Sequence, residues 1–116
     1  MEPLVLTKAR AFASRIIKAE RYLKKEKHEY NISNQVLRSG TAISALIAEA
    51  QYAQSKADFI NKMSIALKEA NETRNWITLL HAGEYIDDKT YASIFDDINQ
   101  LVMILIKIVR SSKENS

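Results

Sequence analysis

Apolar residues recur along most of the chain at alternating steps of three and four, the spacing that places side chains on one face of an α-helix. The first series consists of Val5, Ala9, Phe12, Ile16, Ala19 and Leu23. Three similar series follow, within residues 36–50, 59–80 and 91–109. The pattern therefore predicts four amphipathic helices.

The residues that can begin or end a helix fall between these series. Pro3 suits a first helical position, because its fixed φ and missing N–H cost nothing there. Ser33, Ser55 and Asp87 can act as N-caps, since their side-chain oxygens can accept hydrogen bonds from free backbone amides. Gly83 is a natural C-terminal stop. We expect helices at about 3–27, 33–53, 56–82 and 88–112.

Long helices joined by short connections pack as antiparallel neighbours. The expected fold is all-α, an up-and-down antiparallel four-helix bundle. A chain of 116 residues with one continuous pattern is the size of one domain, so we expect a single bundle over 1–116. The chain has no cysteine, no N-terminal signal-like run and no apolar stretch of the ~20 residues that span a bilayer. These features predict a cytoplasmic protein without membrane contact.

Some apolar residues lie away from the predicted core faces. They are Ile65, Trp76 and Leu79 in the third helix, and Met103 and Ile104 in the fourth. One interpretation is that they are contacts at the edge of the core, or ordinary exposed residues. We favour an interface between subunits, because a Trp among aliphatic side chains is the type of anchor that interfaces use. The apolar run 101–106 supports this, since a helix that is apolar on every side must be buried on every side.

The predicted second helix contains small residues and two charged residues that need explanation. Gly40 inside a helix costs ~1 kcal/mol relative to Ala, so we expect another helix, of this chain or of a second subunit, to approach closely there. Arg38 and Glu49 share a face among small apolar residues, and we expect both to form ion pairs with the third helix. The candidate partners are Glu69 or Glu72 for Arg38, and Lys62 or Lys68 for Glu49.

Positive charge is concentrated near the N-terminus. Residues 1–27 hold eight Lys or Arg against three acidic residues, whereas residues 84–116 hold four against six. The cations opposite the apolar stripe of the first helix, or flanking that side, are Arg10, Arg15, Lys18, Arg21, Lys24 and Lys25. Such a surface can bind phosphates without reading base identity. The alternative is an ordinary solvated surface, since the net charge of +3 is modest and Tyr22 is the one aromatic residue among these cations.

Several motifs carry a resemblance to a known family. They are Arg38-Ser39-Gly40-Thr41-Ala42-Ile43, Ile47-Ala48-Glu49-Ala50, Ser55-Lys56-Ala57-Asp58-Phe59 and Glu72-Thr73-Arg74-Asn75-Trp76. These motifs resemble the bacterial four-helix-bundle proteins encoded within intervening sequences of 23S rRNA and, more distantly, the accessory variability protein of diversity-generating retroelements. The resemblance implies a bundle that assembles into a pentameric ring. For the retroelement relatives it also implies binding to nucleic acid and to a reverse transcriptase through a basic surface.

Motifs for catalysis are absent from the sequence. It has no Gly-rich phosphate loop, no nucleophile elbow and no zinc-protease motif. A di-iron bundle needs Glu three residues before each His, but Lys25 and Thr78 stand three residues before His28 and His81. We therefore expect no enzyme, no metal and no cofactor.

The hypothesis is a non-enzymatic oligomeric scaffold or binding module. As a pentameric ring, it would bind RNA or DNA through the basic outer face of its first helix. The expected partners are other copies of the chain, RNA or DNA, and a nucleic-acid-handling protein. The alternative is a protein–protein interaction scaffold without nucleic-acid binding, whose basic face binds an acidic partner.

Overall fold

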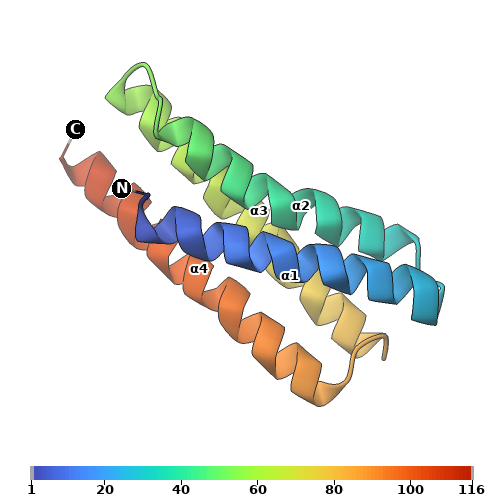
Figure 1. Ribbon diagram of the computed structural model, residues 1–116. Coiled ribbons are helices and arrows are strands. Elements are labelled where there is room, and N and C mark those ends of the chain that lie inside the picture. The colour runs from blue at the N-terminus through green and yellow to red at the C-terminus, as the bar shows by residue number, and fades with distance from the viewer. Residues whose placement is uncertain (1, 116) are drawn as a thin grey trace.

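A computed structural model describes residues 2–115, and its helices form an up-and-down bundle (Figure 1). The helices are α1 (Leu4–Lys27), α2 (Asn31–Ala50), α3 (Lys56–Ala82) and α4 (Asp88–Glu114). The start of α1 and the end of α4 lie at the same end of the bundle (Figure 1). The all-α bundle predicted from the sequence is confirmed.

The core runs along the middle of the bundle and takes residues from all four helices. Phe12 and Ile16 of α1, Ile43 of α2, Ile77 of α3 and Leu105 of α4 are each almost completely buried. These side chains belong to the apolar series that predicted the helices. Their burial supplies most of the driving force for folding.

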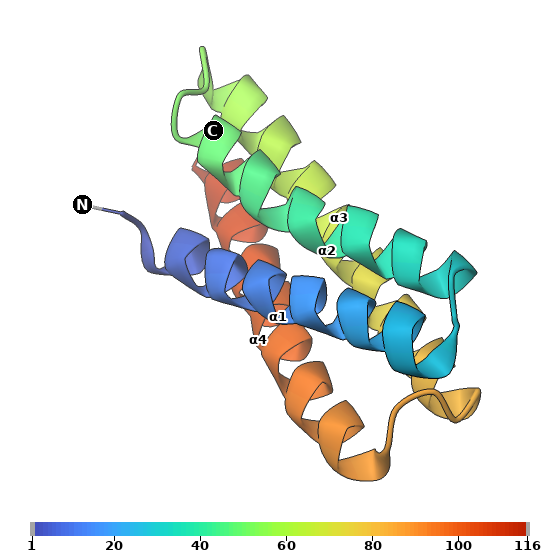
Figure 2. The same cartoon turned by 45° about the vertical axis from the view of Figure 1, so that its right-hand side comes forward.

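The four seams between neighbouring helices are not equally closed. α1 and α4 pack against each other less extensively than do α1 and α2, α2 and α3, or α3 and α4. From two viewpoints, the C-terminal half of α1 diverges from the N-terminal half of α4 (Figures 1 and 2). On this side a groove is lined by residues of α1, among them Lys18 and Tyr22, and by residues at the start of α4.

Gly40 explains why the opposite side of α1 is closed. A Cβ added at Gly40 would lie 3.0 Å from Cγ2 and 3.1 Å from Cγ1 of Ile16. The close approach predicted at this glycine is therefore between two helices of the same chain. The contact offsets the low helix propensity of a glycine in the middle of α2.

The beginning of α2 differs from the prediction. Ser33 is buried inside the first turn of the helix instead of capping it. The buried carboxylate of Glu29 accepts hydrogen bonds from the backbone amides of Ile32, at 3.1 Å, and Ser33, at 2.7 Å. The Ser33 hydroxyl donates to the Glu29 carbonyl instead. The left-handed conformation of His28 (φ 53°) turns the chain just before Glu29.

The end of α2 also differs slightly, because the helix stops at Ala50 and not at residue 53. After Ala50 the backbone amides of Gln51, Tyr52 and Ala53 bond to carbonyls three residues back, which ends the α-helical pattern. The N-caps of α3 and α4 are as predicted, whereas Pro3 lies just before α1 as its N-cap and α4 ends at Glu114 and not at residue 112. Ser55 accepts from the amide of Asp58 at 3.0 Å, and Asp87 accepts from the amide of Thr90 at 2.7 Å.

Candidate nucleic-acid interface

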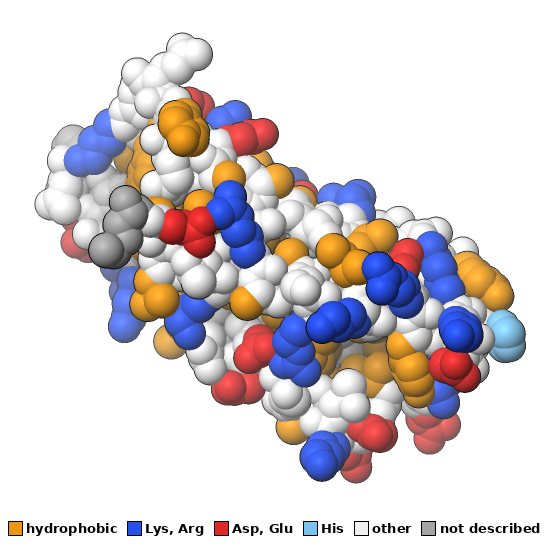
Figure 3. Space-filling model, viewed as in Figure 1, with side chains coloured by type: hydrophobic (Ala, Val, Ile, Leu, Met, Phe, Trp, Pro, Cys, Tyr) orange, Lys and Arg blue, Asp and Glu red, His pale blue; other side chains and the backbone are white. Residues whose placement is uncertain are grey.

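The outer face of α1 presents cations to solvent. Figure 3 shows Lys and Arg side chains gathered in a band over this helix. Lys18, Arg21 and Lys25 are exposed, and within residues 2–115 none of them has a hydrogen bond or an ion pair. Their charges are therefore available to a ligand.

The three other cations predicted for this face are paired. Arg10 forms an ion pair with Glu2, and Arg15 forms one with Asp97 of α4. Lys24 lies 2.8 Å from Glu20, one turn earlier on α1. These pairs reduce the positive charge that the three cations offer to a phosphate. The strongest part of the candidate interface is therefore the C-terminal half of α1.

Polar side chains bridge the open seam between α1 and α4. Arg15 also lies 3.2 Å from the hydroxyl of Ser93, and Lys8 donates to the side-chain oxygen of Gln100 at 3.2 Å. The sequence did not indicate these bridges, because each joins two residues more than 70 positions apart. Which residues of α1 and α4 lie opposite each other depends on how the two helices pack, and no local pattern shows this. The bridges leave a groove on the side of Lys18 and Tyr22.

The acidic side of this groove is the start of α4. Asp87 caps the helix, and its hydrogen bonds from the backbone and the side chain of Thr90 lower the pKa of its carboxyl group. The carboxylate is therefore charged at neutral pH. The groove thus has cations on its α1 side and an anion on its α4 side.

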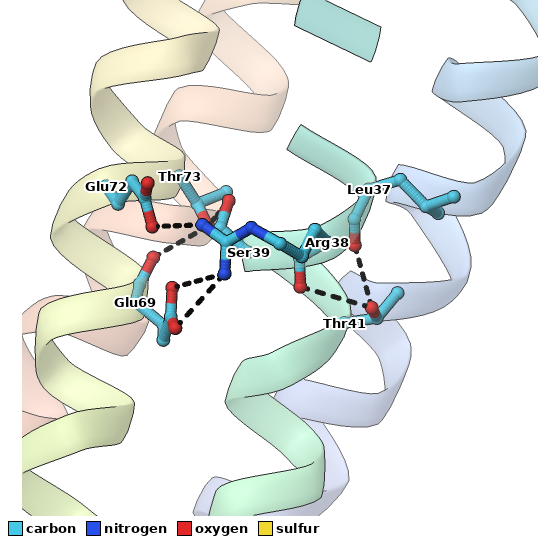
Figure 4. A network of polar contacts seen from close by, with 7 residues as sticks. All are labelled: Leu37, Arg38, Ser39, Thr41, Glu69, Glu72 and Thr73. Carbon is cyan, nitrogen blue, oxygen red and sulfur yellow. Dashed lines mark hydrogen bonds and ion pairs between the residues drawn. The ribbon is translucent and has the colours of Figure 1, made fainter. Parts of the chain in front are cut away.

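Arg38 has a different role from the free cations of α1. Its guanidinium lies 2.6 Å from Glu72 and 3.3 Å from both carboxylate oxygens of Glu69 (Figure 4). Both candidate partners on α3 are thus used. Lys62 lies 3.6 Å from Glu49, so the second pair predicted between these helices is also formed. The two charged residues of α2 join it to α3.

The two glutamates beside Arg38 respond to it in opposite directions. The hydrogen bond from Arg38 lowers the pKa of Glu72, whereas partial burial raises the pKa of Glu69 despite the nearby guanidinium. The pKa of Arg38 itself is raised, mainly by the hydrogen bond to Glu72. Beneath this network, the buried hydroxyls of Ser39 and Thr73 are hydrogen-bonded at 2.7 Å (Figure 4).

The five residues predicted at a subunit interface fall into two groups. Ile65, Leu79 and Met103 are 37%, 42% and 53% exposed. Trp76 and Ile104 are partly buried and pack against the core of their own chain. The indole Nε1 of Trp76 is buried without a hydrogen-bond partner among the described residues. Trp76 and Ile104 therefore contact the edge of the core, and their place in an interface stays a prediction.

Two general properties of the described part of the chain bear on its chemistry. None of its helices has an apolar stretch long enough to cross a membrane. Across residues 2–115, no group of three His, Cys, Asp or Glu side chains is arranged to hold a metal ion. His81 instead contacts Asp88 at 2.7 Å and stacks on Tyr91, which joins the end of α3 to the start of α4.

The fold and its charges define a class of protein: a small, all-α, up-and-down bundle with one cationic outer helix. Residues 2–107 match the family model described as 23S rRNA-intervening sequence protein. The chain belongs to this family.

A solved structure supports the assignment. It is described as a protein with unknown function from the S23 ribosomal protein family of Bacteroides thetaiotaomicron VPI-5482. The two proteins are 49% identical, and the match covers 91% of this chain and 98% of that one, with a TM-score of 0.90. A search of curated proteins finds no match. Neither of the two descriptions names a reaction.

Proposed function

We propose that the protein is a non-enzymatic, oligomeric binding module that binds RNA or DNA through the outer face of α1. The observation that carries the proposal is the set of unpaired cations Lys18, Arg21 and Lys25 on one exposed face. Phosphate binding needs such solvent-facing charges, because each neutralised phosphate releases condensed counterions. Binding of this type depends on salt and only weakly on sequence.

The contrast with the other charged residues supports this choice of surface. Arg10, Arg15, Lys24 and Arg38 are all engaged by carboxylates of the same chain. Their contacts contribute to the structure of the bundle, whereas Lys18, Arg21 and Lys25 contribute to no contact that stabilises it. Lys107 and Arg110 of α4 are also exposed and, among the described residues, unpaired, so the proposal depends on the gathering of three free cations on one face of α1.

Assembly would strengthen such an interface. In the proposed pentameric ring the three free cations would be repeated five times, so weak contacts could act together through high effective concentration. The exposed apolar side chains of Ile65, Leu79 and Met103 support self-association, since they lie outside the core of the single chain. The number five comes from the family resemblance.

The test of nucleic-acid binding uses charge reversal. A variant carrying Lys18→Glu, Arg21→Glu and Lys25→Glu should lose binding to fluorescent structured RNA and DNA in a salt series. The matched control carries Lys89→Glu, Lys107→Glu and Arg110→Glu on α4, which changes the net charge equally but on another exposed face. The control should keep most of the affinity.

Two results would overturn the proposal. If the wild-type protein binds no nucleic acid at low salt, the cations are ordinary solvated residues, and a protein partner becomes the better hypothesis. If both triple variants lose affinity equally, overall charge and not the α1 face is responsible.

The test of assembly uses an exposed apolar residue. Leu79→Glu should reduce the solution mass measured by light scattering, whereas Asn75→Glu, also exposed on α3, should not. Leu79 is preferable to Trp76 for this test, because Trp76 packs against the core and its substitution would also disturb the fold. An unchanged mass for Leu79→Glu would exclude this part of α3 from the interface.

A further inference from the structure

The groove between α1 and α4 has the composition of a ligand site. Its volume is about 550 Å³. Ala19 and the buried Ile94 contribute apolar surface, and Ile86 adds more from the connection before α4. Arg15, Lys18 and Tyr22 line the α1 side, whereas Asp87 and Thr90 line the α4 side. An apolar surface bordered by a few polar groups is typical of small-molecule and base-binding sites.

Tyr22 is the aromatic residue of this groove, and its structural contacts do not explain its position. It is 45% exposed. Within the described residues its ring stacks on no other ring, and its hydroxyl has no hydrogen-bond partner. The ring is therefore free to stack on a ligand.

Two of the free cations flank this ring on the surface of α1. Lys18 lies one turn before Tyr22 on α1, and Lys25 lies three residues after it, so both neighbour the ring on the helix surface. Arg21 precedes Tyr22 in sequence but points to another part of the helix surface and does not line the groove, so it adds charge only to the outer face of α1. Lys18 and Lys25 are separated by about 10 Å along the helix axis. An aromatic platform bordered by cations along a groove is the arrangement with which proteins bind single-stranded nucleic acid.

We propose that the groove between α1 and α4 accepts an unpaired base of single-stranded RNA or DNA, which stacks on Tyr22 while the adjoining phosphates contact Lys18, Arg21 and Lys25. The inference rests on the proposed function and specifies its ligand as an unpaired strand. In a duplex the faces of the bases are stacked within the helix, so they cannot reach Tyr22.

The charge distribution sets the orientation of the strand. Asp87 repels phosphates from the α4 side of the groove, and the cations of α1 attract them to the opposite side. The backbone therefore follows α1, and the base points across the groove over Ala19 and Ile94. No base identity is read by stacking alone, because every base has a π-face.

The test compares two single strands of equal length and charge, one with thymine bases and one in which the bases are replaced by abasic sites. The wild-type protein should bind the base-bearing strand about five to 150 times more tightly, the range that corresponds to ~1–3 kcal/mol per stacked base. Tyr22→Leu keeps apolar bulk but removes the aromatic face, and should abolish this preference. Tyr22→Phe should retain it.

Matched controls separate stacking from charge and from folding. Tyr52→Leu replaces a more exposed tyrosine at the other end of the bundle and should leave the preference unchanged. Thermal unfolding of each variant shows whether it folds. Tyr22→Leu should bind the abasic strand with the same affinity and salt dependence as the wild type, because the cations remain.

The outcomes distinguish this inference from the proposed function. If the wild type binds both strands equally, or if Tyr22→Leu keeps the preference, phosphate binding stands and the base site is wrong. If Tyr22→Phe loses the preference as fully as Tyr22→Leu, the hydroxyl and not the ring is responsible, and stacking is also wrong. If the wild type binds neither strand at low salt but binds structured RNA or DNA, the base site is wrong and phosphate binding stands, whereas both proposals fail if it binds none of these nucleic acids.

Discussion

The two sides of α1 are packed by different physical means. Toward α2, Gly40 lets the backbones approach until Ile16 fills the space in which a Cβ would lie. Toward α4, the polar bridges of Lys8 and Arg15 cross the seam, and the helices diverge beyond them to leave an open groove on the side of Lys18 and Tyr22. On the closed side an added side chain would have to displace Ile16, whereas the open side leaves room for a ligand. The same helix thus serves the fold with one side and the candidate site with the other.

The largest expected effect comes from filling the closed side. Gly40→Val should destabilise the protein by about 1–3 kcal/mol, since added methyl groups in a well-packed contact force neighbouring atoms to move. Urea unfolding measures the loss. Ala45→Val is the matched control, because Ala45 is exposed on the same helix and its substitution introduces the same β-branched side chain.

A double variant identifies the cause. In an Ile16→Ala background the same Gly40→Val substitution should cost less, because the atoms it would meet are gone. If Gly40→Val and Ala45→Val cost the same, the closed side is not limited by shape and the comparison fails.

The second prediction asks what burial adds to a polar contact. Thr73→Val leaves the Ser39 hydroxyl buried without its partner and should cost about 1–3 kcal/mol. Thr78→Val is the control, since the Thr78 hydroxyl bonds to the Arg74 carbonyl on the exposed surface of the same helix. Adding Ser39→Ala to Thr73→Val should recover part of the loss in urea unfolding. If Thr73→Val lowers the free energy of unfolding by no more than Thr78→Val does, burial adds nothing to this contact.

Most of this architecture was predictable, because it follows from local patterns. The series of apolar residues predicted each helix, and Ser55 and Asp87 cap their helices as short polar residues usually do. The candidate partners of Arg38 were also correct, since Glu69 and Glu72 lie one turn apart on the facing helix.

The errors occur where a local rule was overruled by the surrounding structure. The sequence indicates Ser33 as an N-cap, but the left-handed turn at His28 positions the carboxylate of Glu29 to accept from the first backbone amides of α2 in its place. Trp76 lies off the core face of an ideal helix, but its large ring also packs against the core, and its place in an interface stays a prediction. A long side chain extends its contacts beyond the face on which its Cα lies.

The candidate site was only partly predictable for a related reason. The six cations of α1 were identified by sequence position, but half of them are neutralised by carboxylates. Two of those carboxylates, Glu2 before the helix and Asp97 on α4, lie outside the pattern of α1. The groove itself arises from the divergence of two helices, which no local pattern describes.

The third prediction concerns Arg38 and the acidic range of pH. The pKa of Glu72 is lower in the folded protein than in the unfolded chain, so its carboxylate stabilises the fold at pH values above the unfolded-state pKa. This stabilisation is lost as the pH falls through the folded-state pKa. The pKa of Glu69 is raised, so protonation of Glu69 favours the folded state and opposes this loss. Arg38→Met should therefore destabilise the protein at pH 7, by less than about 1 kcal/mol because the pair is exposed. The difference from the wild type should shrink below about pH 4 as the carboxylates are protonated.

Arg21→Met provides the comparison for that experiment. Arg21 is an exposed arginine without a partner in the described chain, so its loss should change stability little, and equally at both pH values. Urea unfolding at pH 7 and pH 3.5 gives six free energies, those of the wild type and the two variants at each pH. A difference for Arg38→Met that stays constant between the two pH values would show that its ion pairs contribute nothing to stability.

The smallest expected effect is on the open side of α1. Arg15→Met removes the bridge to Asp97 and Ser93 while keeping a long apolar side chain on α1. Both members of the ion pair are more than a third exposed, so water and salt screen their attraction, and the loss should stay below about 0.5 kcal/mol. Lys18→Met on the same helix removes an unpaired charge and should change the free energy of unfolding by a similarly small amount. Suppose instead that Arg15→Met alone lowers the free energy of unfolding by more than about 1 kcal/mol. The bridge would then stabilise the packing of α1 on α4 about as much as the Gly40 contact stabilises its packing on α2. In that case the groove would be a rigid part of the packed structure and not a surface left open beside it.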